Sequence, residues 1–249
     1  MKWLYRFCAL ALAIMLVCPA AMAQRLTDQE LSSYYGDAVV VGDSLPRMLR
    51  NYISNLQGDD PTLFEGMRFF TYYSYRLRSA ARETINADEI NLVYKGQDYV
   101  LCKLMAQLKP GKLFILAGLN DKIGEKPEKG MEYVEEIMRL MAQYAPDTKV
   151  YFFSITPVTA RANKERPNLQ EKWDAYNRLL EEKCAQVGAI YVEIAESLKN
   201  EKGLLPASLS HDGLYHLNDE GNKIWVEMLL DFAQSRYDAG SWKPGEGGY

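Results

Sequence analysis

The sequence predicts an α/β protein in which one parallel sheet of five strands lies between two layers of helices. Five short apolar segments alternate with segments whose apolar residues recur every three or four positions, and this alternation is typical of repeated strand–helix units. The 249 residues are 48% hydrophobic and 25% charged, as in ordinary globular proteins. No linker rich in Pro, Gly and Ser divides the chain, so we expect one large domain.

The segment 1–23 has the features of an export signal. Lys2 and Arg6 precede the apolar run 7–17, and a small-x-small pattern ends at Ala23. The run is shorter than the roughly 20 residues that span a membrane. We therefore expect cleavage near Ala23 and a periplasmic or secreted protein with no stable membrane insertion. An uncleaved anchor is the alternative interpretation.

Removal of that signal leaves a mature chain that begins at 24, with the folded domain expected over 24–236 and a flexible, Gly-rich tail over 237–249. Two of the 29 Lys and Arg residues leave with the signal, so 27 remain against 33 Asp and Glu, a formal charge of −6. Phosphate contacts depend on clustered Lys and Arg side chains, so nucleic acid is not an expected partner.

The first half of the chain is predicted to contain two strands and four helices. Thr27 and Glu30 form a capping-box pattern that begins the first helix, and Pro110 stops the last one. In order, we expect a helix at 27–35, a strand at 37–41, a helix from Ser44 to about Leu56, a strand at 67–73, a helix at 74–84, an irregular stretch, and a helix at 100–108.

The second half continues the alternation. We expect strands at 112–117, 150–155 and 189–194, and helices at 131–144, 169–184 and 218–235. Ligands of parallel sheets bind beyond the carboxyl ends of the strands, where the strand order reverses. Residues after the first, second and third strands are therefore the first place to look for chemistry.

Two cysteines remain after the signal, and each occupies an apolar position of a predicted helix. We expect Cys102 and Cys184 to be buried free thiols, with a disulfide as the alternative. Neither lies near a second Cys or a His at metal-ligand spacing. The sequence also has no phosphate loop or dinucleotide fingerprint, so no metal or other cofactor is expected.

A serine stands directly after the first predicted strand, in the segment Gly-Asp-Ser-Leu at 42–45. A Ser at a strand-to-helix turn presents its hydroxyl above the sheet, and its own N–H lies at a helix N-terminus that stabilises negative charge. Ser44 is therefore a candidate nucleophile. The alternative is that Ser44 only caps the helix.

The loop after the third strand has the sequence Gly-Leu-Asn-Asp at 118–121. The side-chain amide of Asn120 can donate a hydrogen bond to an oxyanion formed at Ser44, and Gly118 allows a close approach of substrate or backbone. The alternative is an ordinary turn, since Asn, Asp and Gly are common turn residues.

The only two histidines of the sequence flank a short loop before the last helix. His211 and His216 lie on either side of Asp212 and Gly213. A His base activates a Ser by accepting its proton, and a neighbouring carboxylate orients the imidazole. A pair of surface-loop histidines is the alternative.

Together, these three motifs resemble those of the SGNH hydrolase family, also called the GDSL esterases and lipases. The order of the motifs and the α/β pattern match across almost the whole mature chain. The resemblance implies a flavodoxin-like fold, with Ser44 as nucleophile, His216 as general base and Asp212 as its orienting partner. It also implies oxyanion donors at the Ser44 N–H and the Asn120 side chain. His211 is then a loop residue or a substrate contact.

The sequence departs from the family pattern in two places. The family usually has two residues between its Asp and His, whereas three residues separate Asp212 from His216, an i,i+4 spacing that still lets the pair face each other in a helical turn. The Gly expected after the second strand is replaced by the segment 72–75, in which the Ser74 N–H can substitute as the third oxyanion donor. Losing one such donor costs on the order of 3 kcal/mol of transition-state stabilisation.

An aromatic cluster passes the same loop. We expect core packing for most of its members and a substrate-facing position for the others. Candidate substrate contacts are Tyr73, Tyr75, Gly118 and His211. The cluster consists of Phe69, Phe70, Tyr72, Tyr73 and Tyr75, followed by Arg76 and Arg78.

The resemblance implies a serine esterase that hydrolyses a carboxylic ester through an acyl-enzyme, and the segment 1–23 indicates that it is exported. O-acetylated glycans, lipid esters and aryl esters are all compatible substrates. The two departures motivate an alternative function, in which the protein is a pseudo-enzyme that keeps the fold and binds a glycan with little or no turnover.

Overall fold

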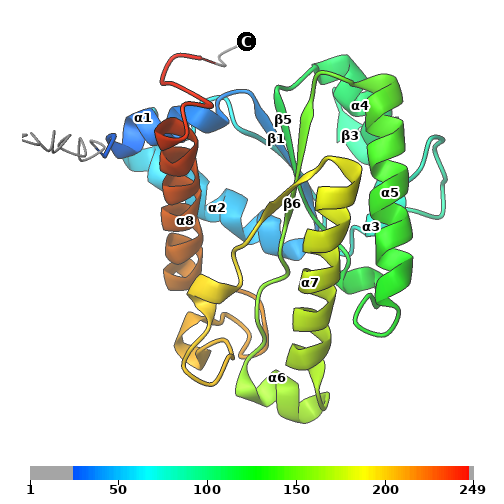
Figure 1. The fold of residues 1–249 in the computed structure, drawn as a ribbon, viewed down its shortest axis with the longest axis vertical. Helices are drawn as coiled ribbons and strands as arrows, with labels where there is room; N and C mark the ends of the chain where they lie inside the picture. The colour runs from blue at the N-terminus through cyan, green and yellow to red at the C-terminus, as the bar shows by residue number, and fades with distance from the viewer. Residues whose placement is uncertain (1–24, 247–249) are drawn as a thin grey trace, which may run out of the picture.

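The computed structural model describes residues 25–246 and has a central five-stranded sheet with helices on both faces (Figure 1). The strand order is β2-β1-β5-β6-β7, and every neighbouring pair is parallel. This confirms the predicted fold class. The predicted export signal at 1–23 lies outside the described residues. The strands are β1 (Ala38–Gly42), β2 (Arg68–Thr71), β5 (Lys112–Leu116), β6 (Lys149–Phe153) and β7 (Ile190–Val192).

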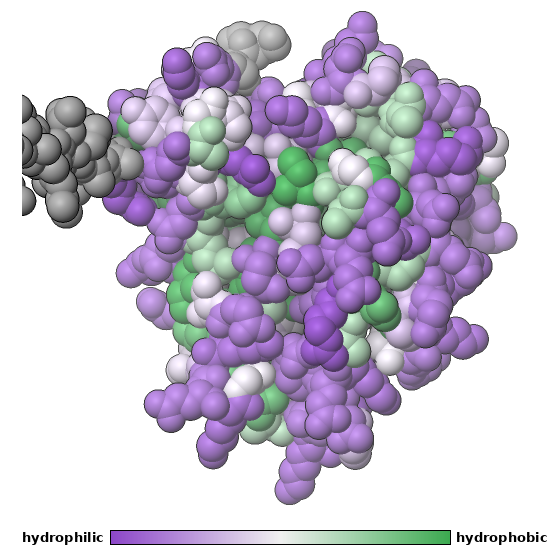
Figure 2. Space-filling model, viewed as in Figure 1, coloured by the Kyte–Doolittle hydropathy of each residue, from purple (hydrophilic) through white to green (hydrophobic). Residues whose placement is uncertain are grey.

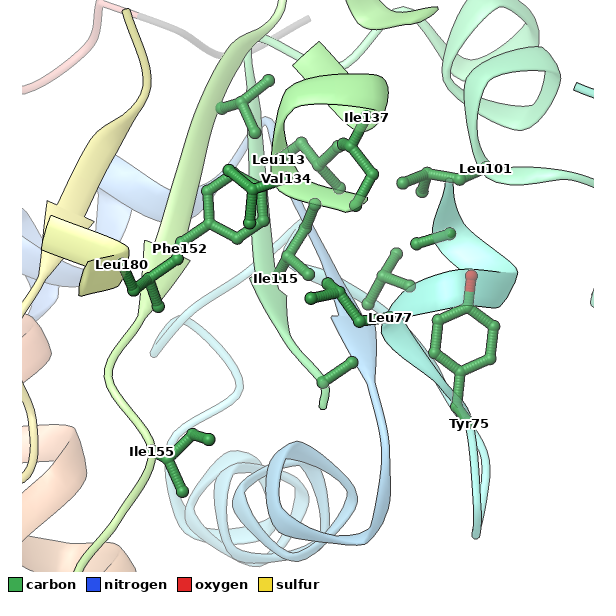
Figure 3. Close-up of a cluster of buried hydrophobic side chains, with 14 of the residues drawn as sticks. Tyr75, Leu77, Leu101, Leu113, Ile115, Val134, Ile137, Phe152, Ile155 and Leu180 are labelled. Carbon is green, nitrogen blue, oxygen red and sulfur yellow. The ribbon is translucent and has the colours of Figure 1, made fainter. Parts of the chain in front are cut away.

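The helices form two layers because alternate strand residues point to opposite faces of the sheet. Val40 packs in the cluster under one layer, and Val39 and Val41 pack in the cluster under the other, part of which Figure 3 shows. The first layer has α1 (Asp28–Ser32), α2 (Ser44–Asp59) and α8 (Asp219–Asp238). The second has α3 (Leu77–Ala80), α4 (Leu101–Leu108), α5 (Pro127–Tyr144) and α7 (Leu169–Val187). Hydrophilic residues cover most of the outer helix surface in this view (Figure 2).

Short elements complete the chain. The helix α6 (Ala160–Glu165) lies at the lower edge in Figure 1, where the carboxyl ends of the strands also lie. The 3₁₀ turns are η1 (Ser33–Tyr35), η2 (Leu119–Asp121), η3 (Glu196–Leu198) and η4 (Ala207–Leu209).

The region 74–99 differs from the prediction. The helix expected at 74–84 is reduced to α3, and the expected irregular stretch contains the antiparallel hairpin of β3 (Leu92–Tyr94) and β4 (Gln97–Tyr99). Asp121 accepts hydrogen bonds from the N–H groups of Leu77 and Arg78 and fixes the start of α3 there. This contact is made across the fold, so the local pattern does not reveal it.

The C-terminal segment also differs from the prediction. The helix α8 continues to Asp238, and the side chain of Trp242 is only 5% exposed. Its ring packs edge-on against Tyr34, with the ring centroids 5.1 Å apart. The domain boundary that we predicted at 236 is therefore wrong, since the folded part of the chain includes Trp242.

The two cysteines behave as predicted. Cys102 and Cys184 are both buried, and neither forms a disulfide in the described part of the chain. Burial raises the pKa of both thiols, to about 12 for Cys184. Residues 25–246 include no helix that is long and apolar enough to cross a membrane.

The sheet order brings three loops together. The strand β1 lies between β2 and β5. The chain therefore adds β2 on one side of β1 and later adds β5 on the other side, so the strand order reverses at β1. The loops that follow β1, β2 and β5 therefore meet at the carboxyl edge of the sheet. These loops contain Ser44, Ser74 and Asn120.

Candidate active site

Ser44 is held at a tight strand-to-helix turn. A Cβ atom on Gly42 would lie 2.1 Å from the carbonyl oxygen of Leu116, so only Gly fits there. Asp43 is fully buried and caps α2, since its Oδ1 accepts a hydrogen bond from the Leu45 N–H at 3.1 Å. Ser44 is then the first residue of α2, and its N–H has no partner within the helix.

A chain of hydrogen bonds joins Ser44 to two residues of the loop before α8. Ser44 Oγ lies 2.8 Å from Nε2 of His216, and Nδ1 of His216 lies 2.6 Å from Oδ2 of Asp212. An ionised carboxylate only accepts hydrogen bonds, so Nδ1 carries the proton of the neutral imidazole. The Ser44 hydroxyl therefore donates to Nε2, the arrangement in which a His can remove a proton from Ser.

The loop backbone is wrapped around the carboxylate of Asp212. Its Oδ1 accepts hydrogen bonds from the backbone N–H of Leu214, Tyr215 and His216, and from the hydroxyl of Ser210. Partial burial raises the pKa of Asp212, but the hydrogen bonds from His216 and Leu214 outweigh it and lower the pKa to about 2. Asp212 is therefore ionised at neutral pH.

The three-residue separation of Asp212 from His216 is accommodated without a helical turn. Gly213 has a φ of 72°, and the segment from Asp212 to Tyr215 forms a bend. Glycine adopts this left-handed conformation without steric cost. The departure from the usual spacing thus leaves the Asp–His contact intact.

The candidate hydrogen-bond donors for an oxyanion lie in the loops after β2 and β5. Nδ2 of Asn120 donates to the carbonyl oxygen of Tyr75 at 3.2 Å, which ties these loops together and leaves the second hydrogen of the amide for another acceptor. Ser74 has a φ of 63° at the third position of the turn 72–75, where glycine is favoured. Within residues 25–246, its N–H makes no hydrogen bond.

The aromatic cluster divides between core and surface. Tyr75 is 1% exposed and its ring belongs to the buried cluster of Figure 3, so the prediction that its side chain contacts substrate is wrong. Phe69, Phe70 and Tyr72 also pack against the core, as expected. Tyr73 is 63% exposed and is the member of the cluster that faces solvent.

A cavity of about 500 Å³ lies along the first turns of α2. Tyr73, His211 and Arg47 line it, together with Asp219 and Glu220 at the start of α8. The guanidinium of Arg47 lies over the ring of Tyr73, 4.6 Å from its centroid. Arg47 was not among the residues predicted from the sequence, although its position one helical turn after Ser44 is a usable signal.

Gly118 also has the geometry expected of a close approach. Its φ is 136°, and a Cβ atom there would lie 2.8 Å from Cδ1 of Ile123. Gly118 thus packs against the side chain of Ile123, and its contact with substrate stays a prediction. In the part of the chain that the structure describes, His, Cys, Asp and Glu side chains form no group of three that can hold a metal ion.

Most of the chain is similar to a known protein family. The model of the GDSL-like lipase/acylhydrolase family matches residues 40–224. A search of curated protein sequences found no match.

Many solved structures are similar to the chain in fold, among them the following three. A GDSL-like lipase from Bacteroides thetaiotaomicron is 13% identical, with a TM-score of 0.56 over 85% of this chain and 92% of its own. A catalytic mutant of an acetylxylan esterase from Geobacillus stearothermophilus is 18% identical, with a TM-score of 0.52 over 79% and 93%. An α/β hydrolase from the metagenome of Lake Arreo, Spain, is 16% identical, with a TM-score of 0.51 over 80% and 94%.

Proposed function

Since the chain belongs to the GDSL-like lipase/acylhydrolase family, we propose that it is an exported serine esterase that hydrolyses carboxylic esters. The family supports hydrolysis of an ester. The observation that carries the serine mechanism is the hydrogen-bonded chain from Ser44 through His216 to Asp212. Export rests on the predicted signal at 1–23.

In the first half of the reaction, Ser44 Oγ attacks the ester carbonyl carbon while Nε2 of His216 takes the hydroxyl proton. The carboxylate of Asp212 holds the Nδ1 proton and stabilises the imidazolium that forms. Negative charge develops on the carbonyl oxygen, where the N–H groups of Ser44 and Ser74 and the amide of Asn120 are the proposed donors. The imidazolium then protonates the leaving alcohol.

In the second half, water replaces the alcohol. His216 takes a proton from the water, which attacks the acyl group on Ser44, and the same proton returns to Ser44 Oγ as the acid leaves. Every transfer uses Nε2, so one histidine serves both steps.

An O-acetylated glycan is the substrate class that we favour. The exposed ring of Tyr73 beside the cavity along α2 offers a flat apolar surface of the kind that stacks on sugar rings. One similar structure is described as an acetylxylan esterase, which fits the same class. Lipid and aryl esters are alternatives that substrate comparison distinguishes.

A second candidate function is glycan binding without turnover. Ser74 in place of the family's Gly favours it, because a third oxyanion donor from a Ser backbone is unusual there. Under this alternative, Tyr73 and the cavity along α2 bind the sugar, and Ser44 has no nucleophilic role.

The test is hydrolysis of 4-nitrophenyl acetate by the mature protein and by Ser44→Ala and His216→Ala. We expect each substitution to lower kcat at least about a thousandfold, since triad residues act as a unit. Ser235→Ala, which removes an exposed hydroxyl near the end of α8, is the matched control and should keep the wild-type rate. Equal rates for the wild type and Ser44→Ala would favour glycan binding over catalysis.

A further inference from the structure

A second cavity lies beside the loop that contains Asn120. Its volume is about 430 Å³, and its walls come from the segment 119–125 after β5 and from the segment 166–173 at the start of α7. We call it the α7 cavity. Leu119, Ile123, Leu169 and Trp173 give it an apolar wall. The α7 cavity has no part in the mechanism proposed above.

The charged residues of the α7 cavity are mostly cations. Lys122, Arg166 and Lys172 line it with exposed side chains, and Glu125 is the one carboxylate among its lining residues. Within residues 25–246, none of the three cations forms an ion pair with a carboxylate. The whole chain has a formal charge of −4, so this concentration of positive charge is not a general property of its surface.

Lys122 also lines a neighbouring cavity. That cavity, of about 260 Å³, is bordered by Arg76 and Arg78, by the carboxylate of Asp121, and by the proposed oxyanion donor Asn120, so its charged lining is still net positive. Both arginines are partly neutralised by Glu89, whereas Lys122 is not. Positive charge thus extends from the α7 cavity to the residue that we assign to the oxyanion.

Two contacts connect the α7 cavity to the reacting groups. Leu119 precedes Asn120 in the chain. The ring of Trp173 packs against Tyr215 with centroids 5.5 Å apart, and the ring of Tyr215 lies 4.7 Å from that of His216. The lining of the α7 cavity therefore adjoins Asn120 in the chain and is separated from His216 by the ring of Tyr215.

The cavity along α2 has the opposite charge balance. Arg47, Asp219 and Glu220 are the charged residues that line it, so its charged lining is net negative. An anionic group on the substrate is consequently drawn toward Lys122 and away from the start of α8.

We propose that the α7 cavity, lined by Lys122, Arg166 and Lys172, binds a carboxylate carried by the ester substrate, so that the preferred substrate is an ester of an acidic glycan. This proposal rests on the proposed esterase function and specifies its substrate class. The apolar wall accommodates a sugar ring, and the three cations bind the carboxylate of a uronic acid unit.

The kinetic test compares a neutral ester with two carboxylate-bearing esters. 4-Nitrophenyl acetate is neutral, 5-acetoxy-2-nitrobenzoate has its carboxylate on the leaving group, and mono-4-nitrophenyl succinate has it on the acyl group. The readout is the ratio of kcat/KM for each anionic ester to that for the neutral one. We expect the double variant Lys122→Met/Lys172→Met to lower this ratio about fivefold or more for at least one anionic ester, mainly through KM.

Two variants serve as controls. Lys103→Met removes the same charge from an exposed position on α4 that lines neither cavity, and it should keep the wild-type ratio. Lys122→Arg/Lys172→Arg keeps both charges and should also retain the preference. Raising the ionic strength to about 1 M, where the Debye length is about 3 Å, should reduce the wild-type ratio toward that of the double Met variant.

A binding measurement separates this proposal from the esterase proposal. In calorimetry with Ser44→Ala, we expect tetragalacturonic acid to bind more tightly than the neutral xylotetraose. Adding Lys122→Met and Lys172→Met should raise the Kd for tetragalacturonic acid about fivefold or more. Ser44-dependent hydrolysis with unchanged ratios and no charge-dependent binding would overturn the acidic-glycan proposal alone. Hydrolysis that does not depend on Ser44 would overturn the esterase mechanism, while the calorimetry still decides the role of the α7 cavity.

Discussion

Asp43 is an ionisable residue in a fully buried position. It precedes Ser44, the proposed nucleophile, has no exposed surface, and its Oδ2 has no hydrogen-bond partner among residues 25–246. Burial is the main cause that raises the pKa of the Asp43 carboxyl to about 7. The hydrogen bond from the Leu45 N–H lowers this pKa, and the nearby carboxyl of Asp121 raises it. The turn that presents Ser44 therefore carries an energetic cost near neutral pH.

This cost has a defined pH dependence. In the unfolded chain an Asp ionises near pH 4, whereas Asp43 stays protonated in the folded state up to about pH 7. Ionisation of the unfolded chain thus favours unfolding increasingly from pH 4 to pH 7. Asp43→Asn keeps an N-cap acceptor but does not ionise. We therefore expect the free energy of unfolding of this variant, relative to that of the wild type, to increase from pH 4 to pH 7 by on the order of a few kcal/mol.

Urea unfolding of the two proteins between pH 4 and pH 8 measures this effect. The comparison starts at pH 4 because Asp212 has the opposite behaviour: its pKa of about 2 lies below the unfolded value, so its stabilisation is lost as the pH falls from about 4 to about 2. The control Asp238→Asn changes an exposed carboxylate near the end of α8. A constant difference between wild type and Asp43→Asn over this pH range would contradict the prediction.

Single residues were predictable from sequence where a motif and a strand end coincide. Ser44 was predictable in this way, whereas Asp212 and His216 were predictable because the two histidines lie beside an Asp just before the last helix. The structure brings these three residues into hydrogen-bond contact. Tyr75 was mistaken for a substrate contact because an aromatic run has no clear period. Only the turn at 72–75 decides that Tyr73 points outward and Tyr75 inward.

At the scale of elements, the loop before α8 depends on one capping residue. Asn218 accepts a hydrogen bond from the Gly221 N–H through Oδ1 and donates from Nδ2 to the carbonyl oxygen of Ser208. Its own N–H donates to the Leu209 carbonyl oxygen. These bonds close the loop that contains His216, so the position of His216, the proposed general base, depends on the start of α8.

We expect Asn218→Ala to lower the free energy of unfolding by about 1–2 kcal/mol and also to lower kcat, because it removes both the cap and the anchor of the His216 loop. Thr27→Ala is the matched control, since Thr27 caps α1 in the same way but far from the site in sequence. It should cost about 1 kcal/mol with kcat unchanged. Urea unfolding and esterase kinetics on both variants check this, and an equal kcat in both would argue against the link.

The elements that were predictable from the sequence are those with a strong local pattern. The strands β1 and β5 are fully buried, and their uninterrupted apolar runs made them recognisable. The hairpin of β3 and β4 was not predicted because its position depends on a distant contact, the hydrogen bond from the Val93 N–H to the Tyr72 hydroxyl. The short helix α6 likewise has only six residues, too few for a periodic signal.

At the scale of the whole molecule, the sheet order assembles the candidate site at one end and leaves the other end for stability. Ser44 and His216 are 172 positions apart in the chain but meet at the carboxyl edge. At the amino edge, Tyr34 connects three parts of the fold: its hydroxyl lies 2.8 Å from that of Tyr151, and its ring contacts Trp242 and the ammonium of Lys112. The segment after α8 thus closes the amino end of the core.

This division predicts a substitution that affects stability without affecting catalysis. Trp242→Ala removes a buried ring from the Tyr34 cluster and should lower the free energy of unfolding by about 2–4 kcal/mol, or the Tm by roughly 5–12 °C for a domain of this size. The value of kcat for 4-nitrophenyl acetate should stay within about twofold of wild type, because Tyr34 and Trp242 lie at the amino edge of the sheet.

Lys243→Ala is the control, since it changes an exposed neighbour of Trp242 in the same segment and should leave the Tm unchanged. Calorimetric unfolding of both variants measures the effect on Tm, and steady-state kinetics measures the effect on kcat. An unchanged Tm in Trp242→Ala would mean that the segment after α8 does not belong to the core, as the sequence pattern alone had indicated. A large loss of kcat at an unchanged Tm would mean instead that the amino edge is coupled to Ser44.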